Sequence, residues 1–375
     1  MSYNSYMRTT RNATLLALLM FTVPCARAES DVKFGPSYPL TVTVESGHKV
    51  GAVIYETPYS IPPSENYDTV LIQGTMPDPA MRIELVVRPK PSVSTAAVFK
   101  QPAFRRFPNG RFWARYTVPL TRQPLKLRVV NLGAHIGSRL SIYEAELFVA
   151  RSVKETRAPG DAVTYVPDPA LSLPETAPFK LVRRAAWQAL PPTVPYVRHA
   201  PFYFTLHHTQ GDYPLTYQAS VSEVLFVQDY HQNGKRWIDI GYHFVIDPAG
   251  NIFEGRPILA EGAHVLSHNP GNIGISILGN YHPPSTDEVT RTSLDSFVSV
   301  GSYLKDTYAV NVSSFYAHRD IGNTDCPGDN LYARKPELSA LIFGPLPQPV
   351  TPADAPPLTP AQQKALNYLK TSLNY

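Results

Sequence analysis

The sequence predicts two domains, an all-β domain over residues 33–150 and an α/β domain over residues 180–343. Three observations lead to this prediction. Apolar and polar residues alternate in short runs before residue 150. Helical spacing and apolar strand-like runs are mixed after residue 180. Between them, residues 151–179 are rich in proline and lack any periodicity, which predicts a linker.

The first 28 residues have the organisation of a secretory signal peptide. Arg8 and Arg11 give a positively charged start. The apolar run over residues 13–23 is too short to span a bilayer as a helix. Residues 26–28, Ala-Arg-Ala, then offer a cleavage site of small residues. We therefore expect residues 1–28 to be removed on export.

Cleavage after residue 28 removes Cys25 and leaves Cys326 as the one cysteine of the exported chain. Attachment of a lipid at Cys25 is the alternative, although Pro24 beside the cut fits a lipoprotein signal poorly. No later segment is apolar enough to form a transmembrane helix. We expect a monomer that is periplasmic or secreted and has no nucleic-acid partner. A net charge of +4 and a pI near 8.8 suit an anionic polymer such as a cell wall.

The expected strands of the all-β domain are short and are separated by turn residues. They lie at residues 40–44, 82–87, 125–129 and 143–148. Alternating strands with one face toward water predict antiparallel sheets packed as a β-sandwich.

One strand of this domain carries a basic, aromatic face. Residues 100–128 contain eight basic residues and no acidic one, and Arg111, Trp113 and Arg115 alternate onto one side of a strand. Two interpretations stay open. The face is either an exposed platform for sugars or anions of a cell wall, or an ordinary strand face whose tryptophan the neighbouring domain covers.

The elements of the α/β domain alternate along the chain. A strand at residues 203–207 precedes a helix over 219–232, which Asn233-Gly234 ends. A hairpin at 242–246 and 251–254, a strand at 273–278 and a helix up to residue 308 follow. The sequence Ser285-Thr286-Asp287-Glu288 predicts a capping box for that last helix. Residues 344–375 form a proline-rich tail with one short helix over 361–373.

Histidines are concentrated in the second domain, where His318 lies eight residues before Cys326. An imidazole and a thiolate at this spacing are typical zinc ligands. His207 is the best third ligand, because on a strand His207 and His208 point to opposite faces and only one can reach a metal. Three protein ligands leave a fourth position for water, which indicates a catalytic rather than a structural zinc.

These residues belong to a longer set of motifs. The set resembles the zinc amidases that include phage lysozyme amidases, bacterial N-acetylmuramoyl-L-alanine amidases and animal peptidoglycan recognition proteins. The matching stretches occur in family order: residues 184–187, 206–209, 237–244, 253–256, 262–264, 272–275, 317–320 and 324–328. The resemblance implies an α/β fold with a mixed central sheet flanked by helices.

The resemblance also implies roles for single residues. His207, His318 and Cys326 would bind Zn²⁺, and Tyr242 and Thr324 would be catalytic. Zinc and the Tyr242 hydroxyl would stabilise negative charge on the carbonyl oxygen. Threonine has no useful pKa, so Thr324 can act only through hydrogen bonds. Members that only bind peptidoglycan typically lack the cysteine, so its presence favours catalysis.

Four further residues are implied to bind substrate: His208, Arg256, His264 and Asn272. For His208 a packing role, and for His264 an ordinary loop position, stay open as alternatives. Asp320 or a backbone carbonyl is expected to hold a ligand imidazole in the correct tautomer. The resemblance therefore implies a zinc-dependent amidase that cleaves the amide between N-acetylmuramic acid and L-alanine of peptidoglycan. A peptidoglycan-binding protein without turnover is the alternative.

Overall fold

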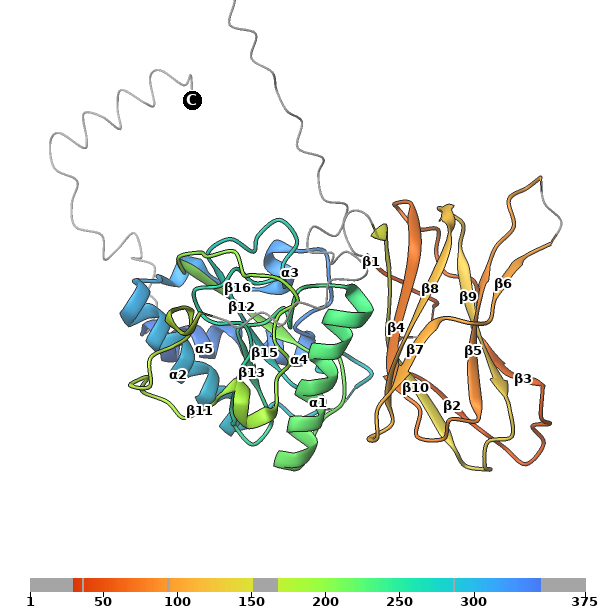
Figure 1. Ribbon diagram of the computed structural model, residues 1–375, viewed down its shortest axis with the longest axis horizontal. Coiled ribbons are helices and arrows are strands. Elements are labelled where there is room, and N and C mark those ends of the chain that lie inside the picture. Colours follow the sequence, from red (N-terminus) through yellow and green to blue (C-terminus); the bar gives the residue numbers. More distant parts are fainter. Residues whose placement is uncertain (1–29, 36, 93–94, 151–167, 286, 345–375) are drawn as a thin grey trace, which may run out of the picture.

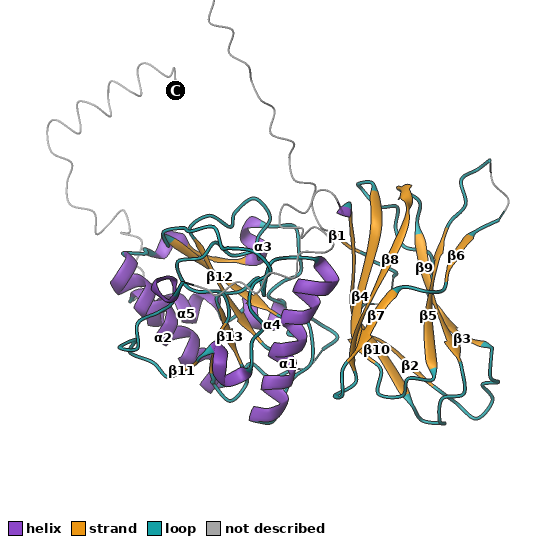
Figure 2. Cartoon of the chain, in the orientation of Figure 1, coloured by secondary structure: helices purple, strands orange, loops and turns teal. Residues whose placement is uncertain are grey.

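The computed structural model describes residues 30–344, apart from 36, 93–94, 151–167 and 286 (Figure 1). The predicted signal peptide, Cys25, most of the predicted linker and the predicted C-terminal helix lie outside the described residues. Within them, Figure 2 shows strands throughout the N-terminal region and a sheet covered by helices in the C-terminal region.

The N-terminal region consists of two antiparallel sheets. The first has the order β1-β10-β4-β8-β7, with β2 also paired to β10; the second has the order β3-β9-β5-β6. Their bounds are β1 Ser30–Asp31, β2 Leu40–Thr43, β3 Val53–Glu56, β4 Tyr67–Thr75, β5 Met81–Val87, β6 Ala97–Phe99, β7 Ala103–Arg106, β8 Arg111–Thr121, β9 Leu125–Asn131 and β10 Arg139–Phe148.

Alternation along these strands produces one core between the two sheets. Val70 and Ile72 of β4 point into this core together with Leu85 of β5 and Leu127 of β9. Leu71 lies on the opposite face of β4 and packs against the C-terminal region instead. The four predicted strands occur here as β2, β5, β9 and β10, and the strand predicted to carry Arg111 and Trp113 is the start of β8. The sequence does not predict β1, β3, β4, β6 and β7.

The C-terminal region contains one mixed sheet in the order β11-β14-β13-β15-β12-β16. Only the β13–β14 hairpin is antiparallel among the described pairs. The strands are β11 Leu181–Val182, β12 Tyr203–His208, β13 Phe244–Ile246, β14 Ile252–Glu254, β15 Asn272–Ile277 and β16 Phe315–Ala317. The α-helices are α1 Tyr217–Asp229, α2 Arg291–Tyr308, α3 His318–Ile321, α4 Asp329–Tyr332 and α5 Lys335–Phe343. Short 3₁₀ helices occupy Pro169–Leu171, Arg184–Trp187 and Val312–Ser314.

Two helix boundaries differ from the sequence prediction. α1 continues as a π-helical turn over Tyr230–Lys235, so the chain passes Asn233-Gly234 before Arg236 ends the helix with a positive φ of 65°. α2 begins after Thr290, whose hydroxyl accepts from the Ser293 N–H, so the predicted capping box at Ser285 is wrong. A hydroxyl cap near the first apolar position competes successfully with one five residues earlier.

Helices cover both faces of the mixed sheet. Leu206, Phe244 and Ile275 form one side of the sheet and pack on α2 and α5. The opposite side includes Val245 and Phe253, which pack on α1. Leu173 is buried in the α2 and α5 core, so the last part of the predicted linker packs onto this region.

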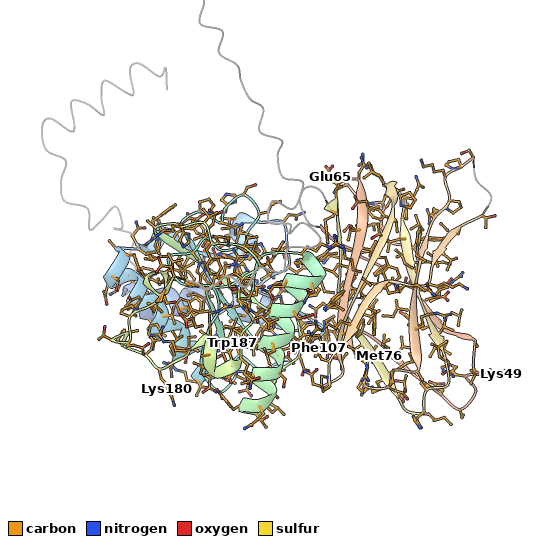
Figure 3. All side chains as sticks on the ribbon, in the orientation of Figure 1. Lys49, Glu65, Met76, Phe107, Lys180 and Trp187 are labelled. Atoms are coloured by element: carbon orange, nitrogen blue, oxygen red, sulfur yellow. The ribbon has the colours of Figure 1, made fainter. Side chains whose placement is uncertain are left out.

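The two regions meet through a buried polar and apolar interface along α1 (Figure 1). Arg111 Nε lies 2.9 Å from Glu223 Oε2, and each side chain is 1% exposed. The Trp113 indole N–H donates to Asp229 over 2.7 Å. Figure 3 shows Phe107 at the same boundary, where its ring makes an edge contact with Phe226.

The basic, aromatic face of β8 is therefore not an exposed platform. Arg111, Trp113 and Arg115 are all buried, and Arg115 donates to the carbonyl oxygen of Gly234. The interpretation in which the neighbouring domain covers the tryptophan is the one that the structure supports. Guanidinium groups occur here because α1 and its π-helical turn present carboxylates and a backbone carbonyl to them.

Candidate metal centre

Three side chains from separate segments converge at one edge of the mixed sheet. The ligand atoms of His207, His318 and Cys326 all lie within 4.8 Å of one another. Nδ1 of His207 is 3.6 Å from Sγ of Cys326. The structure thus brings together the three residues that the sequence predicts as metal ligands.

The strand order explains why the two histidines meet. β12 and β16 are adjacent parallel strands in which Leu206 pairs with Ala317. His207 and His318 follow these two residues directly, so both lie where the strands end. Cys326 reaches the same edge because the Arg319 N–H donates to its carbonyl oxygen, and the His208 N–H lies 3.4 Å from its sulfur.

Register also fixes the face on which the centre lies. His207 pairs with Ser276, and Ser276 pairs with Val245 on the next strand. Residues in register share one face of a sheet, so His207 lies on the α1 side with Val245. That side is also the one that the N-terminal region covers. His208 points to the other face, as the alternation along the strand predicts.

A hydrogen-bonded relay sets the tautomer of His207. Nε2 of His264 donates to the carbonyl oxygen of Asn272 over 3.1 Å, because a carbonyl can only accept. Nδ1 of His264 is then an acceptor, and Nε2 of His207 donates to it over 3.0 Å. Nδ1 of His207 consequently carries a lone pair, and this is the atom that faces Cys326.

The other buried histidines of this region are used differently. In His199, His208, His231 and His243, Nδ1 accepts a backbone N–H from Gly271, Tyr281, Gly241 and Gly274, respectively. These lone pairs are already occupied and cannot bind a metal. The contrast separates His207 from its structural neighbours on chemical grounds.

Two glycines make room for the relay. A Cβ at Gly274 would lie 2.7 Å from the His264 ring, and one at Gly262 would lie 2.6 Å from it. Such distances are far inside van der Waals contact, so any side chain there would move the ring. Glycine at both positions holds His264 against His207.

Burial keeps the imidazoles of the centre neutral. It lowers the pKa of His318 to about 4, with a smaller contribution from the Lys235 charge, and it lowers the pKa of His207 well below its usual range. Burial raises the pKa of the Cys326 thiol. Two neutral imidazoles and one thiol suit Zn²⁺, and the thiol would lose its proton on binding.

The two residues predicted as catalytic lie beside this group. The Tyr242 ring centroid is 5.3 Å from that of His207. The Thr324 hydroxyl accepts the Cys326 N–H over 3.1 Å and so shapes the loop before the thiol. Tyr242 is in contact with the group through its ring, whereas Thr324 reaches it through the backbone.

The four residues predicted to bind substrate are all buried: His208, Arg256, His264 and Asn272. Arg256 donates to the carbonyl oxygens of Ile240 and Glu261, and the Asn272 side chain contacts Thr205 and His268. The structure therefore gives these side chains roles in positioning backbone, and gives His264 the relay described above. We propose no substrate contact for them.

Asp320 does not hold a ligand imidazole. Its carboxylate accepts from the Ala317 N–H and the Tyr332 hydroxyl and pairs with Lys335. Of the two expected partners, Asp320 or a backbone carbonyl, it is the Asn272 carbonyl oxygen that sets the tautomer of His207, and it does so through His264. Sequence spacing could not identify His264, because its partner lies 57 residues away and the contact depends on sheet register.

A second feature near the centre is invisible in the sequence. Lys235, at the end of the π-helical turn, forms an ion pair of 2.7 Å with Glu146 of β10. The carboxylate oxygens of Asp31, Glu144 and Glu146 lie within 4.8 Å of one another. Lys235 acts electrostatically on His318, and Asp31 and Glu144 act on Cys326, so both regions contribute ionisable groups near the candidate metal centre.

Known proteins share the C-terminal region. A family model described as N-acetylmuramoyl-L-alanine amidase matches residues 198–329. Peptidoglycan-recognition protein SC2 of Drosophila melanogaster is 36% identical over 130 residues, which cover 35% of this chain and 70% of the relative. The human N-acetylmuramoyl-L-alanine amidase is 35% identical over 133 residues, or 34% of this chain and 22% of that protein.

Among solved structures, Drosophila peptidoglycan recognition protein SD matches 41% of this chain and 91% of its own, with 25% identity and a TM-score of 0.38. Within the described residues, no helix has the length and apolar character needed to cross a membrane. The chain is 36% identical to the SC2 protein and covers 70% of its length, and the amidase family model matches the same region. The chain belongs to the family of N-acetylmuramoyl-L-alanine amidases and peptidoglycan-recognition proteins.

Proposed function

We propose that this chain is an exported, zinc-dependent N-acetylmuramoyl-L-alanine amidase that hydrolyses the amide between N-acetylmuramic acid and L-alanine. One observation carries the proposal. The thiol of Cys326 and the free lone pair of His207 face each other, and all three candidate ligand atoms lie within 4.8 Å. A complete ligand set is what hydrolysis requires and what binding alone does not.

His207, His318 and Cys326 would hold the zinc ion, which would supply a Lewis acid for the amide carbonyl and for a water molecule. Burial raises the pKa of Tyr242, so its hydroxyl keeps its proton and donates to the oxygen on which negative charge develops. Thr324 holds the Cys326 loop through its own hydrogen bond and has no charge to transfer. Of these two residues, Tyr242 would therefore stabilise charge and Thr324 would position the loop that carries Cys326.

Recognition without turnover is the second candidate function. The family includes proteins named for recognition as well as proteins named as amidases, and the SC2 relatives carry the former name. The presence of Cys326, Tyr242 and both histidines favours hydrolysis over this alternative. Both functions share one partner, peptidoglycan.

Export is part of the proposal and rests on the signal peptide predicted over residues 1–28. After cleavage we expect the protein in the periplasm or the medium, where peptidoglycan is accessible. A processed N-terminus after residue 28, measured by intact mass of the exported protein, supports this location. A lipid mass on Cys25 supports the anchored alternative.

Mass spectrometry of purified peptidoglycan after incubation with the mature chain tests the activity. Free stem peptides that begin at L-alanine should appear with metal and disappear with a chelator or in Cys326→Ser. Restoring zinc should restore release only in the unsubstituted chain. Zinc bound in equimolar amount with no peptide release would favour the recognition function instead.

A further inference from the structure

A cleft of about 310 Å³ opens where the N-terminal region meets the loop that carries Cys326. Residues 31–33, residues 60–64 and Leu147 form its first wall, and residues 323–325 form the second. Thr324 and Asp325 directly precede Cys326, so the cleft lies beside the loop that carries this candidate ligand. The all-β region therefore forms one side of a cleft whose other side is the segment directly before Cys326.

The first wall is fixed in place. The Ser60 N–H donates to the carbonyl oxygen of Leu125 over 2.7 Å, and the Ile61 N–H donates to that of Lys33 over 3.2 Å. Pro62 and Pro63 follow and restrict the backbone further. A wall held in this way needs little ordering when a ligand binds.

The second wall is tied to the metal centre and to the first wall. The Thr324 hydroxyl accepts the Cys326 N–H, and a guanidinium nitrogen of Arg319 donates to the Asp325 carbonyl oxygen. The Asp325 carboxylate pairs with Lys33 from the opposite side. Both partners remain partly exposed, with side chains 38% and 47% accessible, so an incoming charged group can compete for either.

The chemistry of the lining selects the kind of ligand. Lys33 presents an ammonium group, Asp31 and Asp325 present carboxylates, and Ile61 with the two prolines presents apolar surface. None of the residues that line the cleft is aromatic, although sugar rings usually bind by stacking on aromatic side chains. A short peptide with free carboxylates and an amino group matches this mixture better than a glycan does.

We propose that this cleft binds the peptide arm of the substrate, with Lys33 meeting a stem-peptide carboxylate, so that the all-β region is a specificity element of the active site. The inference rests on the proposed function, because it assumes peptidoglycan as the substrate. The proposal gives the N-terminal region a role in substrate binding, which the face of β8 with Arg111, Trp113 and Arg115 cannot have because it is buried.

Calorimetric binding of defined fragments to the zinc-loaded mature chain tests this proposal. The probes are two cleavage products, the tripeptides L-Ala-γ-D-Glu-L-Lys and L-Ala-γ-D-Glu-diaminopimelate, and the disaccharide GlcNAc-MurNAc. Lys33→Ala removes the ammonium, and Ser64→Trp places a bulky side chain in the cleft from the wall opposite the Cys326 loop. Lys49→Ala is the matched control, because Lys49 is exposed and lies at the far edge of the all-β region (Figure 3).

We expect at least one tripeptide to bind and both cleft variants to weaken it about tenfold, the loss typical of one charge-assisted contact. Zinc content and the binding to Lys49→Ala should stay at the unsubstituted level. If Lys33→Ala unfolds, Ser64→Trp decides alone. No tripeptide binding, or binding that both cleft variants leave unchanged, overturns the proposal, as does a loss confined to the disaccharide.

The two proposals fail in distinguishable ways. A chain that binds tripeptide through the cleft but releases no peptide from peptidoglycan contradicts hydrolysis and leaves the cleft standing. A chain that hydrolyses peptidoglycan normally in both cleft variants, with unchanged tripeptide affinity, contradicts only the cleft.

Discussion

Nε2 of His207 donates to Nδ1 of His264 over 3.0 Å, and the two rings are nearly perpendicular. Because His264 itself donates to the Asn272 carbonyl oxygen, the proton positions along the relay are determined by a group that cannot donate. The Asn272 carbonyl oxygen, acting through His264, therefore keeps Nδ1 of His207 unprotonated. Zinc affinity should depend on His264 although it is no ligand.

Replacing His264 by phenylalanine should weaken zinc binding about 10- to 100-fold, the usual effect of losing a partner of a ligand imidazole. Competition with a chromophoric chelator measures the affinity. His264→Gln is the matched variant, because its amide can accept from His207 and donate to the carbonyl oxygen, and it should recover part of the loss. Equal affinity in all three proteins would mean that the relay does not orient the ligand.

Tyr242→Phe should lower kcat about 10²- to 10³-fold, the cost of one donor to a developing oxyanion, and should leave zinc content unchanged. The aromatic ring and its contact with His207 are kept in this variant. Rates on peptidoglycan and metal analysis of the same preparations measure the two effects. An unchanged kcat would reduce Tyr242 to a packing residue.

Zinc binding should release close to one proton per site near neutral pH. The metal-free thiol is protonated because burial raises the pKa of Cys326, whereas the imidazoles are already neutral because burial lowers the pKa of His318 to about 4 and that of His207 well below its usual range. Apparent affinity should then fall about tenfold for each unit by which pH is lowered, and more steeply as pH approaches 4. Titration calorimetry in buffers of different ionisation enthalpy counts the protons, and a count near zero would place a thiolate in the metal-free site.

Much of this architecture follows from short-range patterns. The sequence predicts a strand over residues 203–207, which the structure extends by one residue to His208, and alternation along this strand separates the faces of His207 and His208. The approach of His318 to His207 requires the adjacency of β12 and β16, which no local pattern specifies. Motif resemblance supplied the pairing that local periodicity could not.

The boundary between the two regions is the part that the sequence left open. A strand with Arg111, Trp113 and Arg115 on one side fits a binding platform and a buried interface equally well, because both use guanidinium and indole groups. The hydrogen-bond partners of these three side chains distinguish a buried interface from a platform. They lie about 110 to 120 residues later in the chain: Glu223, Asp229 and the Gly234 carbonyl oxygen. The extension of α1 by a π-helical turn, which brings Gly234 and Lys235 to this boundary, also runs past the expected glycine stop.

The buried pair Arg111–Glu223 should hold the two regions in one cooperative unit. Arg111 also donates to the Gly74 carbonyl oxygen and to the Gln73 side chain, and its guanidinium carbon lies 3.9 Å from the Phe226 ring centroid. Removing the cation leaves Glu223 buried without its partner, so Arg111→Met should lower the free energy of unfolding by about 3–5 kcal/mol. Urea unfolding of the zinc-loaded chain, followed by circular dichroism, measures this loss.

The double variant Arg111→Met with Glu223→Gln separates the pair from the packing around it. With no charge left to desolvate, the double variant should regain a large part of the stability that Arg111→Met loses, giving a coupling energy of about 1–3 kcal/mol. Simple addition of the two single losses would show that the ion pair does not couple the regions. Because the all-β region forms one wall of the cleft beside Cys326, loosening the pair should also raise KM for peptidoglycan more than it lowers kcat.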